Sequence, residues 1–195
     1  MSGAGKTAWA AASAAPARPV KLALFDRDGV LNVDKAYLYR PEEAEWIPGA
    51  REAVAWLNGQ GYTAVVVTNQ SGVARGYYTE EDVRRFHAWM AGEFAKAGAV
   101  LARFYYCPHL KDGVVPAYAI DCACRKPKPG MVLAALRDFG ARPEDCFLVG
   151  DSPRDVAAAE GAGVEGYLYG GGSLLDFVRS LVAARQGSSP EGSGT

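Results

Sequence analysis

Residues 62–67 read Tyr-Thr-Ala-Val-Val-Val, and this uninterrupted, β-branched run constrains the fold more than any other stretch of the chain. A strand with one face in water alternates apolar and polar residues, whereas this run is apolar at nearly every position. It is therefore predicted to be a strand buried on both faces. Such strands belong to parallel sheets that carry helices on both sides.

Similar apolar runs alternate with helix-like segments along the rest of the chain. Strands are predicted over 20–25, 62–67, 100–106, 146–149 and 166–169, and helices over 50–60, from 79 onward, 131–139, 156–160 and 174–184. The helix after Thr79 opens with Thr-Glu-Glu-Asp, a capping box with Asp in place of Glu. This alternation predicts an α/β fold in which right-handed crossovers place helices on both faces of a parallel sheet.

The chain has 195 residues, of which 49% are hydrophobic and 22% charged, enough for one well-buried domain. We expect this domain over 20–185, between a disordered Ala-rich leader at 1–19 and a disordered Gly/Ser-rich tail at 186–195. The net charge of −1 gives no electrostatic reason to expect nucleic acid or an anionic membrane as partner. No apolar stretch approaches the roughly 20 residues that a membrane span needs. A monomer in the cytoplasm is expected.

Polar clusters follow three of the predicted strands. Asp26-Arg27-Asp28-Gly29 follows the first, Thr68-Asn69-Gln70-Ser71 the second, and Gly150-Asp151 the fourth. In parallel α/β folds ligands bind beyond the carboxyl ends of the strands. The clusters therefore predict a site at one edge of the sheet.

Asp26 and Asp28 are two residues apart, so at a strand end their side chains point to the same side. They should repel each other unless a cation lies between them or one is protonated. A nucleophile beside a proton shuttle, held by a divalent metal, suits this arrangement. An ordinary solvated turn is the alternative for the tetrapeptide alone.

If the substrate carries a phosphate, Asp26 can attack phosphorus and Asp28 can move the proton as general acid and base. Mg²⁺ prefers oxygen ligands, which Asp26, the Asp28 carbonyl and Asp151 would supply. Thr68 and Asn69 would donate hydrogen bonds to the phosphoryl group.

Lys126, within Arg-Lys-Pro-Lys-Pro, would offset the charge of the transition state. A solvated basic loop is the alternative for Lys126. For Asp151 and Asp155 the alternative is a position at a helix start, which the helix dipole favours.

Three of the four cysteines cluster with a histidine. Cys107-Pro-His109 and Cys122-Ala-Cys124 offer the thiolate and imidazole ligands of a tetrahedral Zn²⁺ site. Four protein ligands predict a structural zinc. This zinc would fasten the loop between the two ligand pairs and place Arg125 and Lys126 at the edge of the sheet that carries the predicted site. Unrelated thiols and a surface histidine are the alternative.

Cys146 lies in an apolar run and is expected to be a small core residue. Free thiols and a metal site fit a reducing compartment better than disulfides do. We assign His87, on the helix after Thr79, a surface or packing role.

Together these motifs resemble those of the haloacid dehalogenase (HAD) superfamily of phosphatases, from about residue 20 to 169. Phe25–Leu31 resembles its first motif, Thr68-Asn69 the second, Lys126 the third, and Gly150–Asp155 the fourth. The resemblance implies a Rossmann-like fold, catalytic Mg²⁺, Asp26 as nucleophile and Asp28 as general acid/base.

Three segments, 67–76, 106–109 and 122–131, narrow the resemblance to the heptose-1,7-bisphosphate 7-phosphatase family, within the histidinol-phosphatase-like subfamily. That family implies a small phosphorylated sugar as substrate, on the route to nucleotide-activated heptose. The histidinol-phosphate phosphatases share the zinc loop but typically lack the Ser-Gly-Val-Ala-Arg-Gly run and the Pro-Gly-Met run. Both runs are present here, at 71–76 and 129–131.

The resemblance also implies the residues of the site. Those expected to bind substrate are Asp34, Lys35, Ala36, Tyr37, Thr68, Asn69, Gln70, Ser71, Arg125 and Lys126. Those expected to hold Mg²⁺ are Asp26, Asp28 and Asp151, with Asp155 behind them; those for Zn²⁺ are Cys107, His109, Cys122 and Cys124. The chain departs from the family at Lys35-Ala36, where His-Gly is usual, a position expected to affect substrate or anomer preference.

The spacing between motifs leaves no room for a large cap domain, so we expect an open site. A hypothesis of another class is a zinc-stabilised binding module without catalysis. The clustered carboxylates disfavour this hypothesis, because a protein without catalysis has no need to tolerate them.

Overall fold

The computed structural model describes residues 19–187. Most of the predicted leader (1–18 of 1–19) and most of the predicted tail (188–195 of 186–195) lie outside this range. Its strands are β1 (Lys21–Phe25), β2 (Tyr62–Asn69), β3 (Leu101–Cys107), β4 (Phe147–Gly150) and β5 (Glu165–Leu168). Its α-helices are α1 (Ala50–Gly59), α2 (Glu80–Lys96), α3 (Gly130–Phe139), α4 (Pro153–Glu160) and α5 (Leu174–Gly187). Single turns of 3₁₀ helix lie at Pro41–Glu43, Pro116–Tyr118 and Pro143–Asp145.

The five strands form one parallel sheet in the order β3-β2-β1-β4-β5. In register, Phe25 of β1 lies beside Val66 of β2 and Val149 of β4. The carboxyl ends of these three strands therefore meet at one edge, because all of them run in the same direction. The predicted parallel α/β fold is confirmed.

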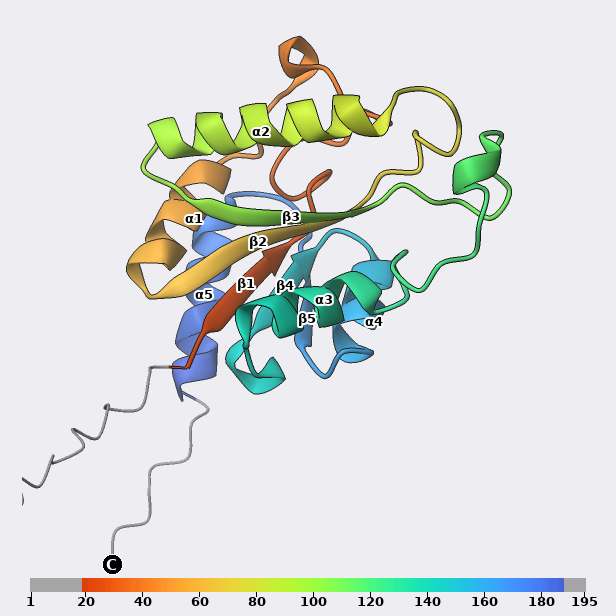
Figure 1. Cartoon of the computed structure of the whole chain (residues 1–195). Coiled ribbons are helices and arrows are strands. Elements are labelled where there is room, and N and C mark those ends of the chain that lie inside the picture. Colours follow the sequence, from red (N-terminus) through yellow and green to blue (C-terminus); the bar gives the residue numbers. More distant parts are fainter. Residues whose placement is uncertain (1–18, 188–195) are drawn as a thin grey trace, which may run out of the picture.

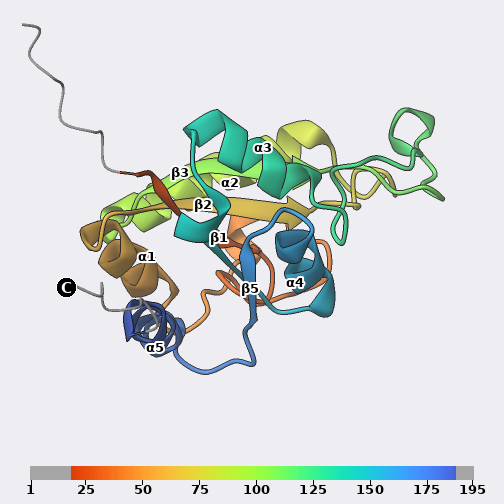
Figure 2. The ribbon, with the colours of Figure 1, turned by 90° about the horizontal axis from the view of Figure 1, so that it is seen from below.

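The helices cover both faces of the sheet (Figures 1 and 2). Alternate residues of each central strand point to opposite faces. On one face Phe25, Val66 and Val149 pack with α1, α2 and α5. On the other face Leu24, Val67 and Leu148 pack with α3 and α4. This double burial explains why the central strands read as continuous apolar runs.

The element boundaries follow the sequence closely, with small differences at the ends. Helix α2 begins with the predicted capping box, in which Thr79 and Asp82 each accept a hydrogen bond from the other's backbone N–H. Strand β2 continues to Asn69, so the predicted phosphate-binding pair ends the strand rather than following it. Helix α4 begins at Pro153, three residues earlier than expected, because proline is well suited to the first turn.

Two segments that hold no strand and no α-helix connect the core to the edge of the sheet where the carboxyl ends of β1, β2 and β4 meet. Residues 26–40 leave β1, and residues 108–129 leave β3 as the long loop at the right of Figure 1. The short segments between motifs hold no cap domain, as predicted. Within residues 19–187, the structure has no helix long and apolar enough to cross a membrane.

Phe94 tests the packing of α2 on the sheet, because its side chain is fully buried and its ring lies edge-on to Trp46 at 5.3 Å. Phe94→Ala should lower the free energy of unfolding by about 3–5 kcal/mol, since it removes buried area and leaves a cavity. Urea denaturation measures this change. Leu133→Ala on α3, where the side chain is 46% exposed, is the matched control and should change stability by less than about 1 kcal/mol. Equal losses would contradict the packing described.

Candidate active site

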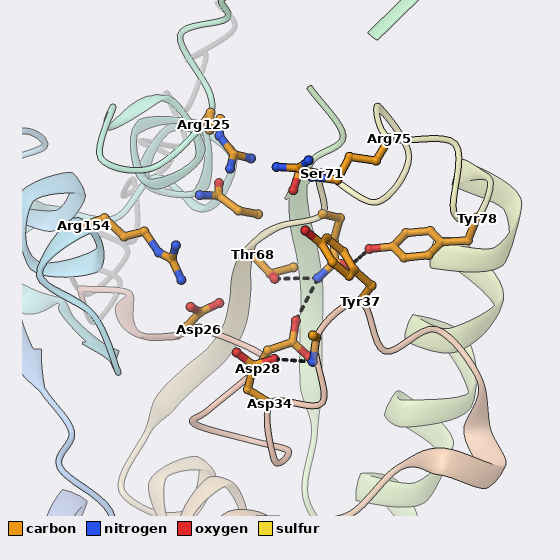
Figure 3. A pocket seen from close by; sticks show the side chains of 13 residues that line it. Asp26, Asp28, Asp34, Tyr37, Thr68, Ser71, Arg75, Tyr78, Arg125 and Arg154 are labelled. Carbon is orange, nitrogen blue, oxygen red and sulfur yellow. Dashed lines mark hydrogen bonds between the residues drawn. The ribbon is translucent and has the colours of Figure 1, made fainter. Parts of the chain in front are cut away.

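Asp26, the first residue after β1, lies at the centre of the site edge. Its backbone N–H donates to the Val149 carbonyl of β4 at 2.9 Å, which continues the sheet pairing by one residue. Its carboxylate Oδ1 lies 2.9 Å from Lys126 Nζ. The Asp26 side chain is 7% exposed and faces the pocket shown in Figure 3.

Lys126 joins three parts of the chain through its ammonium group. Nζ lies 2.9 Å from Asp26 and 2.6 Å from Asp155, and it donates to the Val67 carbonyl of β2 at 2.8 Å. All three ammonium protons can be used in this way. Lys126 is 2% exposed, so this cation is a buried part of the site rather than a solvated loop residue.

Asn69 at the end of β2 holds the backbone of Lys126 in place. Its Nδ2 donates to the Lys126 carbonyl at 3.0 Å, and its Oδ1 accepts from the Lys126 N–H at 3.1 Å. These paired bonds occupy both ends of the amide. Asn69 lines the pocket as predicted, yet its side chain supports Lys126 in this structure.

The charges around Asp26 do not balance. Lys126 supplies one positive charge, whereas Asp26 and Asp155 both contact it. Burial raises the pKa of Asp26 from 3.8 to about 7, and the negative charge of Asp155 adds to the rise, against the opposing effect of Lys126. A further cation is therefore needed to keep Asp26 ionised below neutral pH.

Asp151, directly after β4, completes the carboxylate group at this edge. Oxygens of Asp26, Asp151 and Asp155 all lie within 4.8 Å of one another. Asp151 Oδ1 is buried and has no hydrogen-bond partner in the described part of the chain. Burial, followed by Asp155, raises the pKa of Asp151. An oxygen-rich site with an unpartnered carboxylate atom suits Mg²⁺.

Two glycines allow these carboxylates to approach. Gly29 has φ +84°, and a Cβ there would lie 2.1 Å from Asp151 Oδ2. A Cβ on Gly150 would lie 2.1 Å from the Cβ of Asp155. Asp155 is fully buried and its Oδ2 accepts from the Ser152 N–H at 3.1 Å. One of its oxygens also contacts Lys126 at 2.6 Å, and its predicted place behind the metal ligands stays a prediction.

Asp28 points into the same pocket from the other side of the turn (Figure 3). Its side chain is 23% exposed and pairs with Arg27 at 2.9 Å. Asn32 donates to its Oδ1 at 2.9 Å and Gln70 to its Oδ2 at 3.0 Å. These three partners hold the side chain of Asp28 at the pocket, and its predicted role as a metal ligand through the backbone carbonyl stays a prediction.

Gln70 links Asp28 to Thr68. Its amide nitrogen donates to both Asp28 and Thr68 Oγ1, the second at 2.9 Å. Tyr78 donates to the Gln70 Oε1 at 2.7 Å, and burial raises the pKa of Tyr78 to about 12, so the phenol keeps its proton. Because Tyr78 donates to the amide oxygen of Gln70, the amide nitrogen is the end that faces Asp28 and Thr68.

The pocket has a volume of about 320 Å³. Its lining residues are Asp26, Asp28, Asp34, Ala36, Tyr37, Thr68, Asn69, Gln70, Ser71, Arg75, Tyr78, Arg125 and Arg154. Lys35 is not among the lining residues and instead pairs with Glu45 at 3.1 Å. Lys126 is also absent from the lining, but it contacts the lining residue Asp26 at 2.9 Å. The structure thus brings together most of the predicted substrate-binding residues, but not Lys35.

Sequence reasoning missed Arg75, Tyr78 and Arg154 as pocket residues. Arg75 was visible within the run at 71–76, and Arg154 within the fourth motif, directly before Asp155. Either position could have been inferred from its motif. Tyr78 carried no such signal, because its role depends on the amide of Gln70 folding toward it.

Arginine side chains lie at two sides of the pocket (Figure 3). Arg154 lies on the side of Asp26, whereas Arg125 and Arg75 lie near Ser71. Arg125 donates to the His109 carbonyl at 3.2 Å, and Arg75 lies over the Tyr37 ring at 5.8 Å. Neither contact neutralises the guanidinium. The pocket can therefore accept a ligand with negative charge at both ends.

The four predicted zinc ligands converge at one point of the long loop after β3. The Sγ–Sγ distances are 3.3 Å for Cys107–Cys122 and 3.0 Å for Cys122–Cys124, too long for disulfides. His109 Nδ1 lies 3.7 Å from Cys107 Sγ and 3.6 Å from Cys124 Sγ. This cluster has the ligand types of a closed, structural zinc site.

The thiols in this cluster differ in their proton affinity. Burial raises the pKa of Cys107 and of Cys124. For Cys122, hydrogen bonds from Cys124 and Cys107 outweigh the effect of burial and lower the pKa to about 6. Cys146 is buried in the core, as expected.

The raised pKa of Asp26 predicts how stability depends on pH in protein freed of Mg²⁺. Between its ordinary pKa of 3.8 and the folded value of about 7, the folded protein holds a proton that the unfolded chain has released. This stabilising contribution is therefore lost as pH rises through about 7. Added Mg²⁺ should raise Tm more at about pH 8 than at about pH 5. Asp26→Asn should abolish most of this difference, and an unchanged difference would contradict the assignment.

Comparisons with known proteins agree with this geometry. The family model described as haloacid dehalogenase-like hydrolase matches residues 23–86, and a second HAD-hydrolase-like model matches residues 123–176. A D,D-heptose 1,7-bisphosphate phosphatase from B. bronchiseptica, solved with magnesium and phosphate, superposes with a TM-score of 0.71 at 37% identity, covering 89% of this chain and 90% of that one.

Curated relatives extend the match to nearly the whole chain. The D-glycero-beta-D-manno-heptose-1,7-bisphosphate 7-phosphatase of Rhodopseudomonas palustris is 40% identical over 174 residues, covering 89% of this chain and 96% of that protein. The alpha-anomer enzyme of Burkholderia mallei is 42% identical over 143 residues, covering 73% of this chain and 76% of that protein. This chain therefore belongs to the heptose-1,7-bisphosphate 7-phosphatase family of haloacid dehalogenase-like hydrolases.

Proposed function

We propose that this protein hydrolyses the 7-phosphate of D-glycero-D-manno-heptose 1,7-bisphosphate, a step in the biosynthesis of nucleotide-activated heptose. The observation that carries the proposal is the placement of Asp26, Asp28, Thr68, Lys126 and Asp151 around one pocket edge, in a chain whose relatives bear this name. Hydrolysis of a phosphate monoester needs a nucleophile, a proton donor and positive charge near phosphorus, and these residues provide all three.

Asp26 is the proposed nucleophile. Its carboxylate attacks phosphorus and forms an aspartyl-phosphate, while Asp28, which enters this step as the protonated acid, gives its proton to the departing sugar oxygen as the P–O bond breaks and becomes a carboxylate. Asp28 then takes a proton from the water that cleaves the intermediate. Thr68 Oγ1, which lies in the pocket, is placed to donate to a phosphoryl oxygen.

Mg²⁺, held by Asp26, Asp151 and the Asp28 carbonyl, would neutralise phosphoryl charge when bound. Lys126 adds a fixed positive charge beside Asp26, at 2.9 Å. Its position does not depend on substrate, because Val67 and Asn69 hold it from β2. The site is therefore already arranged for phosphoryl transfer before substrate binds.

The far end of the pocket is suited to the second phosphate. Arg125 and Arg75 lie there, with Ser71 near them (Figure 3). Guanidinium groups bind phosphate through paired N–H donors, so this end would orient the sugar with its other phosphate at Asp26. Curated relatives include enzymes for the beta and for the alpha anomer, and we propose that the segment 34–37 influences which anomer fits.

We further propose that Cys107, His109, Cys122 and Cys124 hold a structural Zn²⁺. The site would fasten the loop that carries Arg125, whose Nη1 already donates to the His109 carbonyl. Its effect on catalysis would be indirect, through the position of Arg125 and Lys126.

A reducing compartment would keep these thiols available, and we propose that the enzyme works in the cytoplasm as a monomer. The four cysteines Cys107, Cys122, Cys124 and Cys146 are free in the structure.

The first test is Asp26→Asn. With Mg²⁺ present, phosphate release from heptose bisphosphate should fall by about 10⁴-fold or more, because an amide cannot attack phosphorus. Malachite-green phosphate detection measures the rate, and circular dichroism checks the fold. The matched control is Asp176→Asn, an exposed carboxylate at the start of α5, which should retain wild-type activity. Comparable activity in Asp26→Asn would exclude the aspartyl-phosphate mechanism.

The same assay identifies the substrate. The two anomers of heptose bisphosphate should show a kcat/KM at least about tenfold above that of histidinol phosphate, because histidinol phosphate lacks the second phosphate for Arg125 and Arg75. A preference for histidinol phosphate would reassign the substrate. No phosphate release from any of the three by folded protein would favour a binding module.

The zinc proposal predicts about one equivalent of zinc in purified protein by elemental analysis. Cys124→Ser should lose the metal and lower Tm, because a structural zinc contributes to folding. Cys146→Ala removes a buried thiol outside the cluster and should keep the zinc. Much less than one equivalent in the wild type would count against the site.

A further inference from the structure

Arg27 is a buried cation between the two catalytic aspartates in sequence, and the proposed reaction assigns it no part. It is 1% exposed and is among the largest fully buried side chains of the described structure. Burying a guanidinium is costly unless an anion and further hydrogen-bond acceptors receive its protons. The partners of Arg27 therefore indicate what it does.

Asp28 is its anionic partner. Arg27 Nε lies 3.1 Å from Asp28 Oδ1 and 3.2 Å from Oδ2, and Nη2 lies 3.0 Å from Oδ1 and 2.9 Å from Oδ2. Asn32 and Gln70 each donate to one of the same oxygens. The plane of the Asp28 carboxylate is thus determined by the guanidinium and two amides, with 23% of the side chain left open toward the pocket.

Helix α2 holds the opposite side of the guanidinium. Arg27 Nη1 lies 3.3 Å from His87 Nε2, and the guanidinium carbon lies 4.8 Å from the centre of the Phe86 ring. His87 is not a surface residue: it is 5% exposed and stacks on Phe104 at 4.5 Å. Burial, followed by Arg27, lowers the pKa of His87 well below its usual value, so the neutral ring can accept from Nη1.

Arg27 also reaches the pocket segment 34–37. Its Nη2 donates to the Leu38 carbonyl at 2.7 Å, directly after Tyr37. Ala36 and Tyr37 have φ of 49° and 64°, a left-handed conformation that non-glycine residues seldom adopt. Such a backbone persists only where surrounding contacts determine it. The buried Leu38 and its bond to Arg27 are contacts of this kind.

We propose that Arg27 is a positioning residue, whose single guanidinium holds the Asp28 carboxylate and the pocket segment 34–37 in one arrangement for proton transfer to the leaving group. This inference rests on the proposed phosphatase reaction. The nitrogens of the planar guanidinium are spread apart, so they bond to Asp28, Leu38 and His87 at the same time. The ammonium of lysine is a single compact group and cannot reach partners on these different sides.

Arg27→Lys tests the proposal, because it keeps the charge and removes the fork. A sugar phosphate needs a proton on its leaving oxygen, whereas p-nitrophenolate departs without one. The variant should lower kcat for heptose bisphosphate by about 10–100-fold, part of the usual contribution of a general acid, and kcat for p-nitrophenyl phosphate by less than about 3-fold. KM for heptose bisphosphate should rise as well. Equal losses of kcat on both substrates would overturn the proposal, since a general structural defect does not distinguish leaving groups.

A double-mutant cycle with Asp28→Asn gives an independent readout. If Arg27 acts through Asp28, the change at Arg27 should lower kcat for heptose bisphosphate by less than about 3-fold once Asp28 is already Asn. Full additivity of the two losses would contradict the proposal. Wild-type protein that releases phosphate from neither substrate would refute the proposed function instead, so the two failures are distinguishable.

His87 provides the test if Arg27→Lys does not fold. His87→Phe removes the acceptor of Nη1 and leaves Asp28 untouched, and His87→Gln retains an acceptor as its matched control. His87→Phe should lower kcat for heptose bisphosphate more than kcat for p-nitrophenyl phosphate, and His87→Gln should restore most of the loss. The same leaving-group ratio in His87→Phe as in wild type would overturn the proposal.

Discussion

The ammonium group of Lys126 is the contact on which the site depends. It joins Asp26 after β1, Val67 in β2 and Asp155 in α4, and these come from three separate stretches of the chain. Burial raises the pKa of Asp26 to about 7, the charge of Asp155 adds to the rise, and the one cation of Lys126 does not offset these effects. A divalent cation at this edge, as proposed above, would restore the charge balance.

A second buried cation, Arg27, organises the other half of the site. Lys126 pairs with Asp26, whereas Arg27 faces Asp28 from the side of α2. The two aspartates differ in their surroundings although they are two residues apart. Asp26, the proposed nucleophile, lies among carboxylates and a lysine, whereas Asp28 is surrounded by hydrogen-bond donors that determine its orientation.

Much of the fold was predictable because the signals are local. A strand buried on both faces has to be apolar throughout, and a helix start needs a capping residue, so 62–67 and Thr79 could be interpreted without tertiary information. The role of the His87 side chain could not be predicted in this way, because a single histidine on a helix does not show which residues it contacts in the fold. Only the packing of α2 on the sheet brings it to Arg27. Lys35 similarly has a neighbour in Glu45 that no motif reveals.

The sequence by itself determined which chemistry is available: two aspartates after a strand, a threonine and an asparagine after another, a lysine, and four zinc-type ligands in two pairs. Each of these depends on residue type and spacing, which the chain carries locally. The tertiary structure decided which of these groups form ion pairs with one another and which line the pocket. Lys126 pairs with Asp26 and Asp155, Asn69 supports it, and Arg75, Tyr78 and Arg154 line the pocket. Such roles depend on distances between segments far apart in the chain, and only the packed sheet and its helices determine those distances.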